Sequence, residues 1–437
     1  MENKDLWFGA IPSHWTYDKI GILFSERRTK VSDKDYAPLS VARIGVVPQL
    51  ATAVKTDAGD NRKLVCNGDF VINSRSDRKG SCGVADRDGS VSLINIVLTP
   101  RNEWNNRYVH YLMRSQPFSE EYYRYGRGIV ADLWTTRYSE MKSILLPIPP
   151  RTEQDQIVRF LDWKVSAINK MAKIQSRKLH LLEQFRDSFI TRLTHYGIHK
   201  DAPLEKTEIA WLGKIPKSWH IRSFSKIARV CTNLVSPNEY LDNFHISPAS
   251  IEKNSGRIIH TQTVQEAGVI SNNHRFFEGQ IIYSKIRPLL NKVVIAPFDG
   301  LCSADMYPIE TSLDIGYLKY FMLSQNFLCQ LTMTKNRVKM PKINQDELSN
   351  VLVVFPRNAE QVEIVKKADE CCRKIQNVIE NVRKYVESLN ELKIRLIADT
   401  VTGKIDVRNI DIPDYEFIGE ESQAEEEIDA EGSENEG

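Results

Sequence analysis

Basic side chains gather in two short stretches of the first third of the sequence. One stretch follows an apolar run, ends at a glycine and contains Arg75, Arg78 and Lys79. The other contains Arg127 and Arg137. Arg and Lys in loops contact phosphate groups, and both also read base edges in the major groove of DNA. The two stretches therefore predict a nucleic-acid-binding surface, with an exposed and inert loop as the alternative interpretation.

Two comparable stretches occur in the second half of the chain. One follows another apolar run and contains Lys285, Arg287 and Lys292, and a later one combines bases with an amide. Equivalent placement in both halves favours a shared binding role. The members of the later stretch are Lys335, Asn336, Arg337 and Lys339.

Motifs that would supply catalysis are missing from the sequence. No GxxxxGK[ST] phosphate loop, HExxH metal motif or GxSxG nucleophile turn occurs. A DNA adenine methyltransferase would need an Asn/Asp-Pro-Pro-aromatic motif, yet the only Pro-Pro pair, Pro149-Pro150, is followed by Arg151. The seven cysteines contain no CxxC pair, so neither a zinc site nor a disulfide framework is indicated. We therefore expect no catalytic residues and no metal ligands in this chain.

Charge is distributed unevenly along the chain. From Asn409 onward there are twelve acidic residues and no Lys or Arg. Residues 1–408 carry all 59 bases and the other 45 of the 57 acids, a net charge of +14, whereas the whole chain has +2. A basic body suits a polyanionic partner, because each neutralised phosphate releases counterions. The acidic segment 409–437 is poor in apolar residues and is predicted to be disordered.

An internal repeat sets the organisation of the chain. The motif W-[FL]-G-x-I-P-x-x-W occurs at residues 7–15 and again at 211–219, 204 positions later. A second match joins residues 108–118 to residues 317–327, with an offset of 209. The period is too long for a solenoid, so the repeat indicates two duplicated domains. The change in offset indicates insertions or deletions in loops, where they are tolerated.

Each repeat begins with a mixed α/β domain, at roughly 11–150 and 215–356. Each domain contains short β-type runs, which are separated by Gly, Pro, Asn and Asp. A helical pattern, at 108–118 in the first domain and 317–327 in the second, interrupts these runs. We expect an α+β fold with a twisted sheet in each domain. Examples of the β-type runs are 70–72, 91–98, 281–283 and 292–296.

Each repeat ends with one long helix. Residues 152–195 and 357–402 contain neither Pro nor Gly, and Gly403 provides a helix stop. A mostly apolar stripe follows alternating steps of three and four, the heptad spacing of a coiled coil. Each position recurs 207 residues later, and we expect the two helices to pair antiparallel in a pseudo-two-fold arrangement that separates the domains. The first stripe comprises Val158, Leu161, Val165, Ile168, Ala172, Gln175, Leu179, Leu182, Arg186 and Phe189.

The sequence contains no pattern that predicts export or insertion into a membrane. The start of the sequence lacks the apolar stretch of a signal peptide, and no run of about 18 apolar residues occurs. With its free cysteines, the chain is expected to be cytoplasmic.

The expected division of the chain has five parts. They are a first domain (1–150), a first helix (151–200), a second domain (201–356), a second helix (357–408) and an acidic tail (409–437).

The tryptophans of the repeated motif allow two interpretations. Trp7, Trp15, Trp211 and Trp219 could stack on bases or pack in a core. The adjacent Ile-Pro pair suits the beginning of a buried strand. We therefore predict that all four pack in the cores or between each domain and a helix.

The chain resembles the specificity subunits of type I restriction-modification systems. The resemblance is carried by the tryptophan motif, the Glu-Gln pairs at the helix starts and the stretch 401–407. The resemblance covers residues 7–408. In that family Pro-x-x-Glu-Gln-x-x-Ile opens each long helix, and residues 150–157 fit this pattern. Residues 356–364 contain one extra residue, so a slightly different helix start is expected in the second copy.

The resemblance implies a function and partners. Each domain would be a target-recognition domain that reads one half of an asymmetric, bipartite DNA site. The paired helices would set the separation of the half-sites and dock two methyltransferase subunits, which a translocase-nuclease restriction subunit would join. S-adenosylmethionine, ATP and Mg²⁺ would then belong to the partners, and this chain would be non-catalytic.

Other functions stay open from the sequence. A specificity subunit of a related type II-like methyltransferase and nuclease assembly would share these features. A self-contained nuclease-methyltransferase would need the missing motifs, and methylation assays on the isolated chain would detect it. A coiled-coil scaffold without a DNA role fits the basic, loop-rich domains less well, and a salt-dependent shift of DNA would exclude it.

Overall fold

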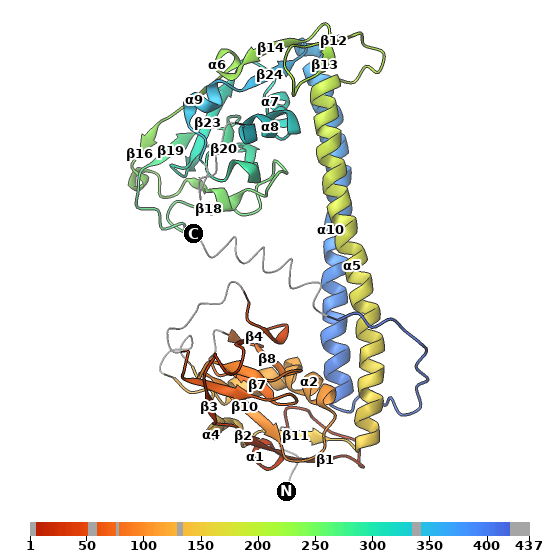
Figure 1. Ribbon diagram of the computed structural model, residues 1–437. Helices are drawn as coiled ribbons and strands as arrows, with labels where there is room; N and C mark the ends of the chain where they lie inside the picture. Colours follow the sequence, from red (N-terminus) through yellow and green to blue (C-terminus); the bar gives the residue numbers. More distant parts are fainter. Residues whose placement is uncertain (1–5, 51–58, 76–77, 129–133, 334–341, 420–437) are drawn as a thin grey trace. The chain divides into compact units, whose positions relative to one another are not determined.

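The chain forms two compact units, which are described one at a time. Unit 1 contains Met1–Arg177 and Arg383–Gly437, and unit 2 contains Lys178–Val382. The computed structural model describes residues 6–50, 59–75, 78–128, 134–333 and 342–419 (Figure 1).

Unit 1 has two small sheets, a hairpin and a pair of strands beside the start of a long helix. Strand β1 (Thr16–Lys19) pairs antiparallel with β11 (Leu145–Ile148), which leads directly into that helix. A four-stranded sheet has the order β2-β10-β7-β8, and a three-stranded sheet has the order β3-β6-β9. The other elements are α1 (Ile20–Leu23), β2 (Phe24–Glu26), β3 (Lys30–Val31), β4 (Leu39–Ala42), β5 (Gly45–Pro48), β6 (Arg62–Val65), β7 (Phe70–Asn73), β8 (Cys82–Val84), β9 (Gly89–Val91), β10 (Asn95–Pro100), α2 (Asn106–Arg114), α3 (Gln116–Arg124) and α4 (Tyr138–Met141).

Unit 2 repeats the strand pair and the four-stranded sheet, but its second sheet has five strands and it has an additional pair, β12-β13. Strand β14 (His220–Ser223) pairs with β24 (Leu352–Phe355), a four-stranded sheet runs β15-β23-β20-β21, and a second sheet runs β16-β19-β22-β17-β18. The other elements are β12 (Leu204–Lys206), β13 (Lys214–Pro216), α6 (Phe224–Ile227), β15 (Ala228–Val230), β16 (Leu234–Val235), η3 (Pro237–Glu239), β17 (Phe244–Ile246), η4 (Pro248–Ser250), β18 (Gln262–Thr263), β19 (Asn273–Phe276), β20 (Ile281–Ser284), η5 (Pro288–Leu290), β21 (Val293–Ile295), β22 (Gly300–Cys302), β23 (Met306–Thr311), α7 (Ile315–Met322), α8 (Gln325–Met333) and α9 (Gln345–Ser349).

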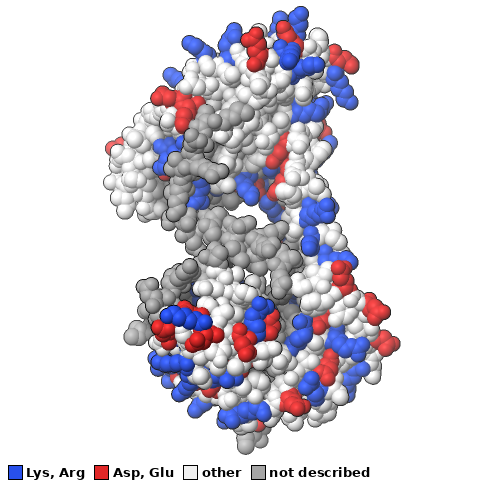
Figure 2. All heavy atoms as spheres, viewed as in Figure 1, with Lys and Arg blue, Asp and Glu red and all other residues white. Residues whose placement is uncertain are grey.

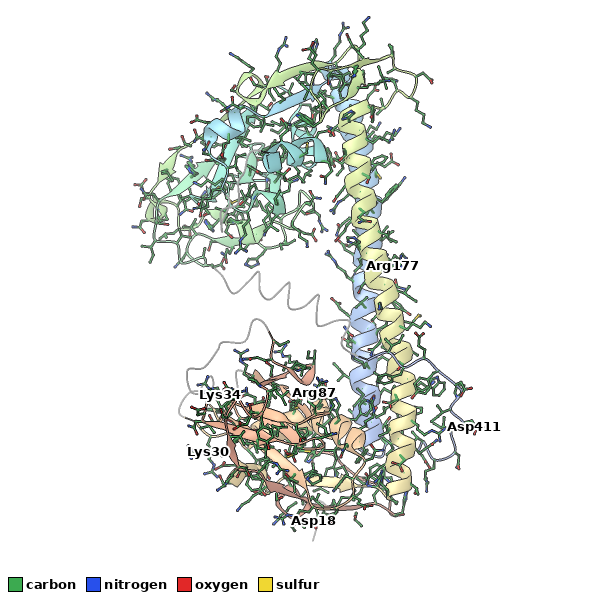
Figure 3. All side chains as sticks on the ribbon, viewed as in Figure 1. Asp18, Lys30, Lys34, Arg87, Arg177 and Asp411 are labelled. Carbon is green, nitrogen blue, oxygen red and sulfur yellow. The ribbon has the colours of Figure 1, made fainter. Side chains whose placement is uncertain are left out.

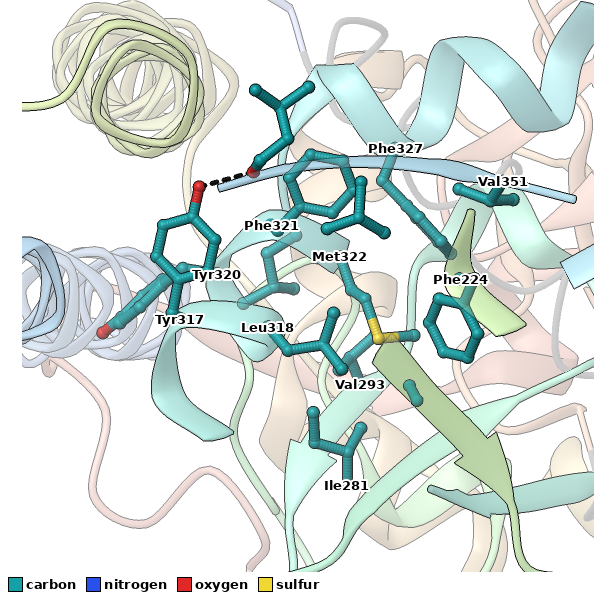
Figure 4. Packing of buried hydrophobic residues seen from close by; sticks show 14 of the residues in the cluster. Phe224, Ile281, Val293, Tyr317, Leu318, Tyr320, Phe321, Met322, Phe327 and Val351 are labelled. Carbon is teal, nitrogen blue, oxygen red and sulfur yellow. Dashed lines mark hydrogen bonds between the residues drawn. The ribbon is translucent and has the colours of Figure 1, made fainter. Parts of the chain in front are cut away.

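The core of unit 2 lies between its four-stranded sheet and helices α7 and α8 (Figure 4). Ile281 of β20 and Val293 of β21 face Leu318 and Met322 of α7, and all four side chains are fully buried. Nearly every side chain of α7 is buried, because the helix contacts the sheet on one side and the long helix on the other. Burial of such apolar area is the main favourable contribution to folding.

The two long helices predicted from the sequence are present. Helix α5 spans Arg151–Tyr196 and α10 spans Asn358–Val401, so the two starts differ by the same 207 positions as the stripes. All ten stripe positions of each helix are buried or half-buried. None of the helices in the described ranges is long and apolar enough to cross a membrane.

Within each unit, the segments of α5 and α10 that contact each other run in opposite directions. In unit 1, Ile168 and Ala172 from the first part of α5 pack with Leu389 from the last part of α10. In unit 2, Ile190 near the end of α5 shares a core with Ile364 near the start of α10. Inside each unit the two helix segments are therefore antiparallel.

The two long helices begin in the same way, so the expected difference between their starts is wrong. Gln154 Nε2 donates to the Pro149 carbonyl at 3.0 Å, and Gln361 Nε2 donates to the Pro356 carbonyl at 2.8 Å. Pro149, not Pro150, is thus the counterpart of Pro356. With Pro149 and Pro356 as counterparts, 207 positions apart, the second copy has no extra residue.

Two other expectations about local structure need correction. The run 91–98 is two strands, β9 and β10, because a turn closes with the Asn95 amide donating to the Ser92 carbonyl at 3.0 Å. Each short helical pattern is two helices that break at a serine. Ser115 Oγ donates to the Leu112 carbonyl at 2.7 Å, and Ser324 Oγ donates to the Phe321 carbonyl at 2.6 Å, so each hydroxyl bonds a carbonyl at the helix end.

The tryptophans pack as predicted. Trp15 and Trp219 are each 6% exposed, and Trp7 and Trp211 are partly buried against the same cores. The ring of Trp219 lies against Gly197, which follows α5, and the ring of Trp15 lies against Gly403, which follows α10.

The acidic tail is ordered at its beginning, which corrects the prediction of disorder from residue 409. Residues 409–419, here called the C-terminal strap, contact α5 within unit 1 (Figure 3, Asp411 labelled). The Ile410 carbonyl accepts from Gln156 Nε2 at 2.9 Å. Ile418 binds α5 twice, since its amide donates to Ser166 Oγ and its carbonyl accepts from Asn169 Nδ2, both at 3.0 Å. The rest of the tail, 420–437, lies outside the described residues.

Candidate nucleic-acid interface

The first basic stretch of unit 1 forms the connection from β7 to β8. Arg75, Arg78 and Lys79 are exposed there. Asn73 Oδ1 accepts from the Arg75 amide at 3.1 Å, so the end of β7 fixes the start of the connection. Gly80 closes it with φ +81°, a left-handed conformation that glycine adopts without steric cost.

The second basic stretch of unit 1 reaches the first one through Thr135. Thr135 forms β-bridges to both Arg75 and Arg127, with the Thr135 amide donating to the Arg127 carbonyl at 3.0 Å. The next amide, of Thr136, donates to the Ser74 carbonyl at 3.0 Å. Thr135 therefore lies between two exposed arginines, Arg75, which is distant in the sequence, and Arg127, which is eight residues away.

The remaining predicted residues of unit 1 flank this junction. Arg137 is exposed, and its amide donates to Glu140 Oε2 at 3.1 Å at the start of α4. The Lys79 ammonium lies 5.4 Å from the centre of the Tyr123 ring. The structure thus brings the predicted basic residues of unit 1 together around the end of β7.

Unit 2 has an equivalent junction at the end of β20. Ile286 forms a β-bridge to Lys342, and the Ile343 amide donates to the Lys285 carbonyl at 2.9 Å. Lys342 was not predicted, although it follows the second basic stretch directly. The predicted residues Lys335, Asn336, Arg337 and Lys339 lie outside the described residues.

Two of the predicted lysines of unit 2 are bound to carbonyl groups of their own unit. Lys285 Nζ donates to the Ala304 carbonyl at 2.7 Å and lies 3.8 Å from Asp305 Oδ1. Lys292 Nζ donates to the Pro248 carbonyl at 2.7 Å. Burial lowers the pKa of the Lys292 ammonium, and the nearby Arg287 charge lowers it further. Arg287 itself is half-buried and has a left-handed backbone, φ +46°.

Charge alone does not locate a DNA-binding face. Figure 2 shows Lys and Arg interspersed with Asp and Glu over the visible surface. Figure 3 marks three exposed bases of unit 1 that the sequence analysis did not select, Lys30, Lys34 and Arg87. Arg87 pairs with Asp86 at 2.7 Å. The positions 204 residues after Lys30 and Lys34 hold Leu234 and Asn238, so the repeat gave no signal for these two lysines.

The junctions present hydrogen-bond donors to solvent. Exposed guanidinium and ammonium groups on strand ends and turns donate hydrogen bonds to phosphate and base-edge acceptors. No group of three or more His, Cys, Asp or Glu side chains that could hold a metal ion occurs among the described residues.

Comparison with known proteins identifies the family. Residues 218–382 match the type I restriction modification DNA specificity domain. The chain is 32% identical over 295 residues to the type I restriction enzyme EcoDI specificity subunit of Escherichia coli, covering 64% of this chain and 66% of that protein. It is 23% identical over 290 residues to the MjaVIII specificity subunit of Methanocaldococcus jannaschii, covering 62% of this chain and 64% of that protein. The matches thus span just under two thirds of these two relatives.

A solved structure shows the same fold. A chain from a study of complex assembly and conformational transition of the type I R-M system superposes with a TM-score of 0.65 at 12% identity. The superposition covers 91% of this chain and all of that chain. With the matches in sequence, the mixed α/β units and the long helices, the chain belongs to the family of type I restriction-modification specificity subunits.

Proposed function

We propose that this chain is the sequence-specific DNA-binding subunit of a type I restriction-modification complex. Each unit reads one half of a bipartite, asymmetric target, and the chain itself catalyses no reaction. Helices α5 and α10 form an antiparallel coiled coil that relates the two domains by pseudo-two-fold symmetry and sets the distance between the half-sites.

One observation carries this proposal. In each unit, segments that are distant in sequence converge by β-bridges at the end of the same strand of the repeated sheet, and both junctions carry basic side chains. Arg75, Arg127 and Arg137 are exposed at the junction of unit 1, and Lys342 is exposed at that of unit 2. The equivalent placement of basic side chains at the two junctions supports two reading sites, although Lys342 Nζ also lies 3.4 Å from Asp305 Oδ1.

The partners follow from the family. We propose that the chain docks two methyltransferase subunits and, through them, restriction-translocase subunits in a cytoplasmic complex. S-adenosylmethionine, ATP and Mg²⁺ are bound by those partners. Double-stranded DNA is the ligand of this chain.

Exchange of one domain tests whether the two sites are independent. Residues 11–150 are replaced by the corresponding domain of another family member, and the methylated adenines are mapped in cells that also express the methyltransferase. One half-site should change and the other should stay the same. A simultaneous change in both half-sites would contradict two separate reading sites.

Removal of the basic side chains tests the junction of unit 1. The triple variant Arg75→Ala, Arg78→Ala, Lys79→Ala should bind DNA more weakly, with a salt dependence flatter by about one unit for each lost phosphate contact. The matched control removes three exposed bases of α5, Lys173, Arg177 and Lys178 (Arg177 is labelled in Figure 3). Equal effects of the two triple variants would show a general charge effect and no site.

A change in helix length tests the spacing role. Inserting seven residues after Ala172 and seven after Ile379 keeps the heptad register and lengthens the paired helices by roughly 10 Å. The unread spacer should then lengthen by roughly two to three base pairs. The insertion in only one helix should prevent assembly. Methylation at the original spacing by a stable double variant would assign the spacing to another element.

A further inference from the structure

Among the described residues other than glycine, left-handed backbone conformations are confined to one small region of unit 2. Within the described ranges they occur at Asn254 (φ +52°), Arg287 (φ +46°) and Asn291 (φ +47°). Asn tolerates this conformation, but a long side chain such as Arg rarely adopts it. Such backbone strain persists where the surrounding structure fixes it, which often happens at functional sites. Arg287 and Asn291 flank η5, in the loop that leads from the basic junction to β21.

Asn254 joins this loop to the loop that contains residues 252–257. The Asn254 amide donates to the Leu290 and Asn291 carbonyls at 3.2 and 3.3 Å. Asn291 Nδ2 donates in return to Asn254 Oδ1 at 3.0 Å, and Asn291 is completely buried. The two left-handed asparagines therefore hold each other.

Helix α5 anchors this pair. Asn254 Nδ2 donates to Asp187 Oδ2 at 2.5 Å, while Asp187 Oδ1 accepts from Arg186 Nε at 3.2 Å. Arg257 of the same loop pairs with Glu380 of α10 at 3.0 Å. All these residues belong to unit 2, so the loop is fixed to the helices of its own unit.

We propose that Asp187 is a positioning residue that acts through Asn254 and Asn291 to fix the loop 285–292, and thereby the direction in which Arg287 meets DNA. Helix α5 then contributes to sequence discrimination at the half-site that unit 2 reads, without touching the DNA. This inference rests on the proposed function. In unit 1 the corresponding turn obtains its left-handed residue from Gly80, so the half-site of unit 1 is an internal control.

Hydrogen exchange tests the anchor without DNA. In the full-length chain, Asp187→Ala should increase exchange at the Asn254 amide, whereas Asp187→Asn keeps an acceptor for Asn254 Nδ2 and should preserve protection. Asn254→Gly keeps the left-handed backbone but removes both side-chain hydrogen bonds, so it should loosen the loop in a folded protein. Unchanged exchange at residues 285–292 in Asp187→Ala and Asn254→Gly would overturn the proposal.

Methylation mapping tests the consequence for specificity. In the assembled complex, Asp187→Ala and Asn254→Gly should reduce discrimination at one half-site by about tenfold, the size expected when one base contact is misplaced. Discrimination at the other half-site and the salt dependence should not change, and Asp187→Asn should behave like the unmodified chain. An equal loss at both half-sites, or no loss, would overturn the positioning role. Absence of sequence-specific methylation with the unmodified chain would instead refute the proposed function.

Discussion

The start of α5 in unit 1 and the start of α10 in unit 2 are surrounded by the same hydrogen bonds. Gln154 Oε1 accepts from the Asn105 amide at 3.0 Å, and Gln361 Oε1 accepts from the Asp314 amide at 2.8 Å. The hydroxyl groups of Tyr108 and Tyr317 also donate to carbonyls of β11 and β24, as Figure 4 shows for Tyr317. These contacts form a frame that both units share.

The loops outside this frame differ. In unit 1, β4 and β5 are joined by a two-residue turn, whereas in unit 2 the segment from β17 to β18 is much longer and contains Asn254. Only unit 1 includes the C-terminal strap, which belongs to its second chain segment. Positions beside the helix starts are therefore alike in the two units, while the loops around the junctions differ. The proposed function, in which the two units read different sequences, requires this division.

Substitution of the glycines after the helices should give the largest loss of stability. An added Cβ would lie 2.9 Å from Trp219 Cζ2 at Gly197 and would overlap Pro12 at Gly403, and both glycines have positive φ. We expect Gly197→Ala and Gly403→Ala each to destabilise by about 2–5 kcal/mol, from backbone strain plus overpacking. Gly279→Ala, at φ +84° in open space, isolates the strain and should cost about 1–2 kcal/mol. Thermal unfolding measures the stability of all three variants, and equal losses would show that the close contacts with Trp219 and Pro12 contribute nothing.

Removal of the repeated glutamine contacts should have a slightly smaller effect. Gln154→Leu and Gln361→Leu each leave a half-buried amide and a buried carbonyl without a partner, which should cost about 2–4 kcal/mol. Because the contacts are equivalent, the two variants should be alike. Hydrogen exchange resolves which unit opens, and it should be unit 1 for Gln154 and unit 2 for Gln361. A large loss for one variant alone would break the equivalence of the frames.

Removal of the C-terminal strap should destabilise unit 1 alone. Truncation after Arg408 exposes the apolar surface that contacts Ile410 and Ile412, at a cost of about 1–3 kcal/mol. Truncation after Gly419 removes nine acids but keeps the strap, so stability should not change. The loss of these nine acids should also strengthen non-specific DNA binding, because fewer negative charges repel the phosphates. Equal thermal stability of the two truncated chains would show that the strap contacts contribute nothing.

Single lysines should show the smallest effects and separate binding from structure. Lys79→Ala should lower the salt dependence of DNA binding by about one unit and change stability by less than about 0.5 kcal/mol. Lys292→Ala leaves the Pro248 carbonyl without its donor and should cost about 1 kcal/mol of stability with no change in salt dependence. Titrations of DNA binding at several salt concentrations distinguish the two. If Lys292→Ala lowered the salt dependence and Lys79→Ala lowered only the stability, Lys292 would be the DNA contact and Lys79 the structural residue.

The paired long helices and the packing of the tryptophans could be predicted from the sequence because they depend on periodic and repeated positions. The stripe from Val158 to Phe189 and its copy 207 residues later required burial in any fold, and all of these positions are buried or half-buried. The paired tryptophan motifs were predicted to pack for the same reason. The sequence has two adjacent prolines before α5 and one before α10, so it leaves the alignment ambiguous, whereas the Gln154 and Gln361 hydrogen bonds fix it.

The loops could not be predicted to the same depth because their structure depends on contacts between distant residues. Nothing in the sequence indicates that Thr135 lies between Arg75 and Arg127, or that Asn254 binds Asp187. The left-handed backbone of Arg287 is unusual for an arginine, so its residue type gave no signal. The strap was missed because three isoleucines among acids resemble a disordered segment until the side chains of Ser166 and Asn169 are seen to bind its backbone.

Unit 1 is assembled from two separate pieces of chain, and this affects the order of folding during synthesis. Unit 2 is a continuous segment, so all its contacts can form once residue 382 has been made. The core of unit 1 includes Val401 and Val407, which pack with Ile157 and Leu161 and emerge last. Domains that fold during synthesis normally do so from the N-terminus. Here we expect the reverse, and proteolysis of ribosome-bound chains of increasing length should protect unit 2 before unit 1.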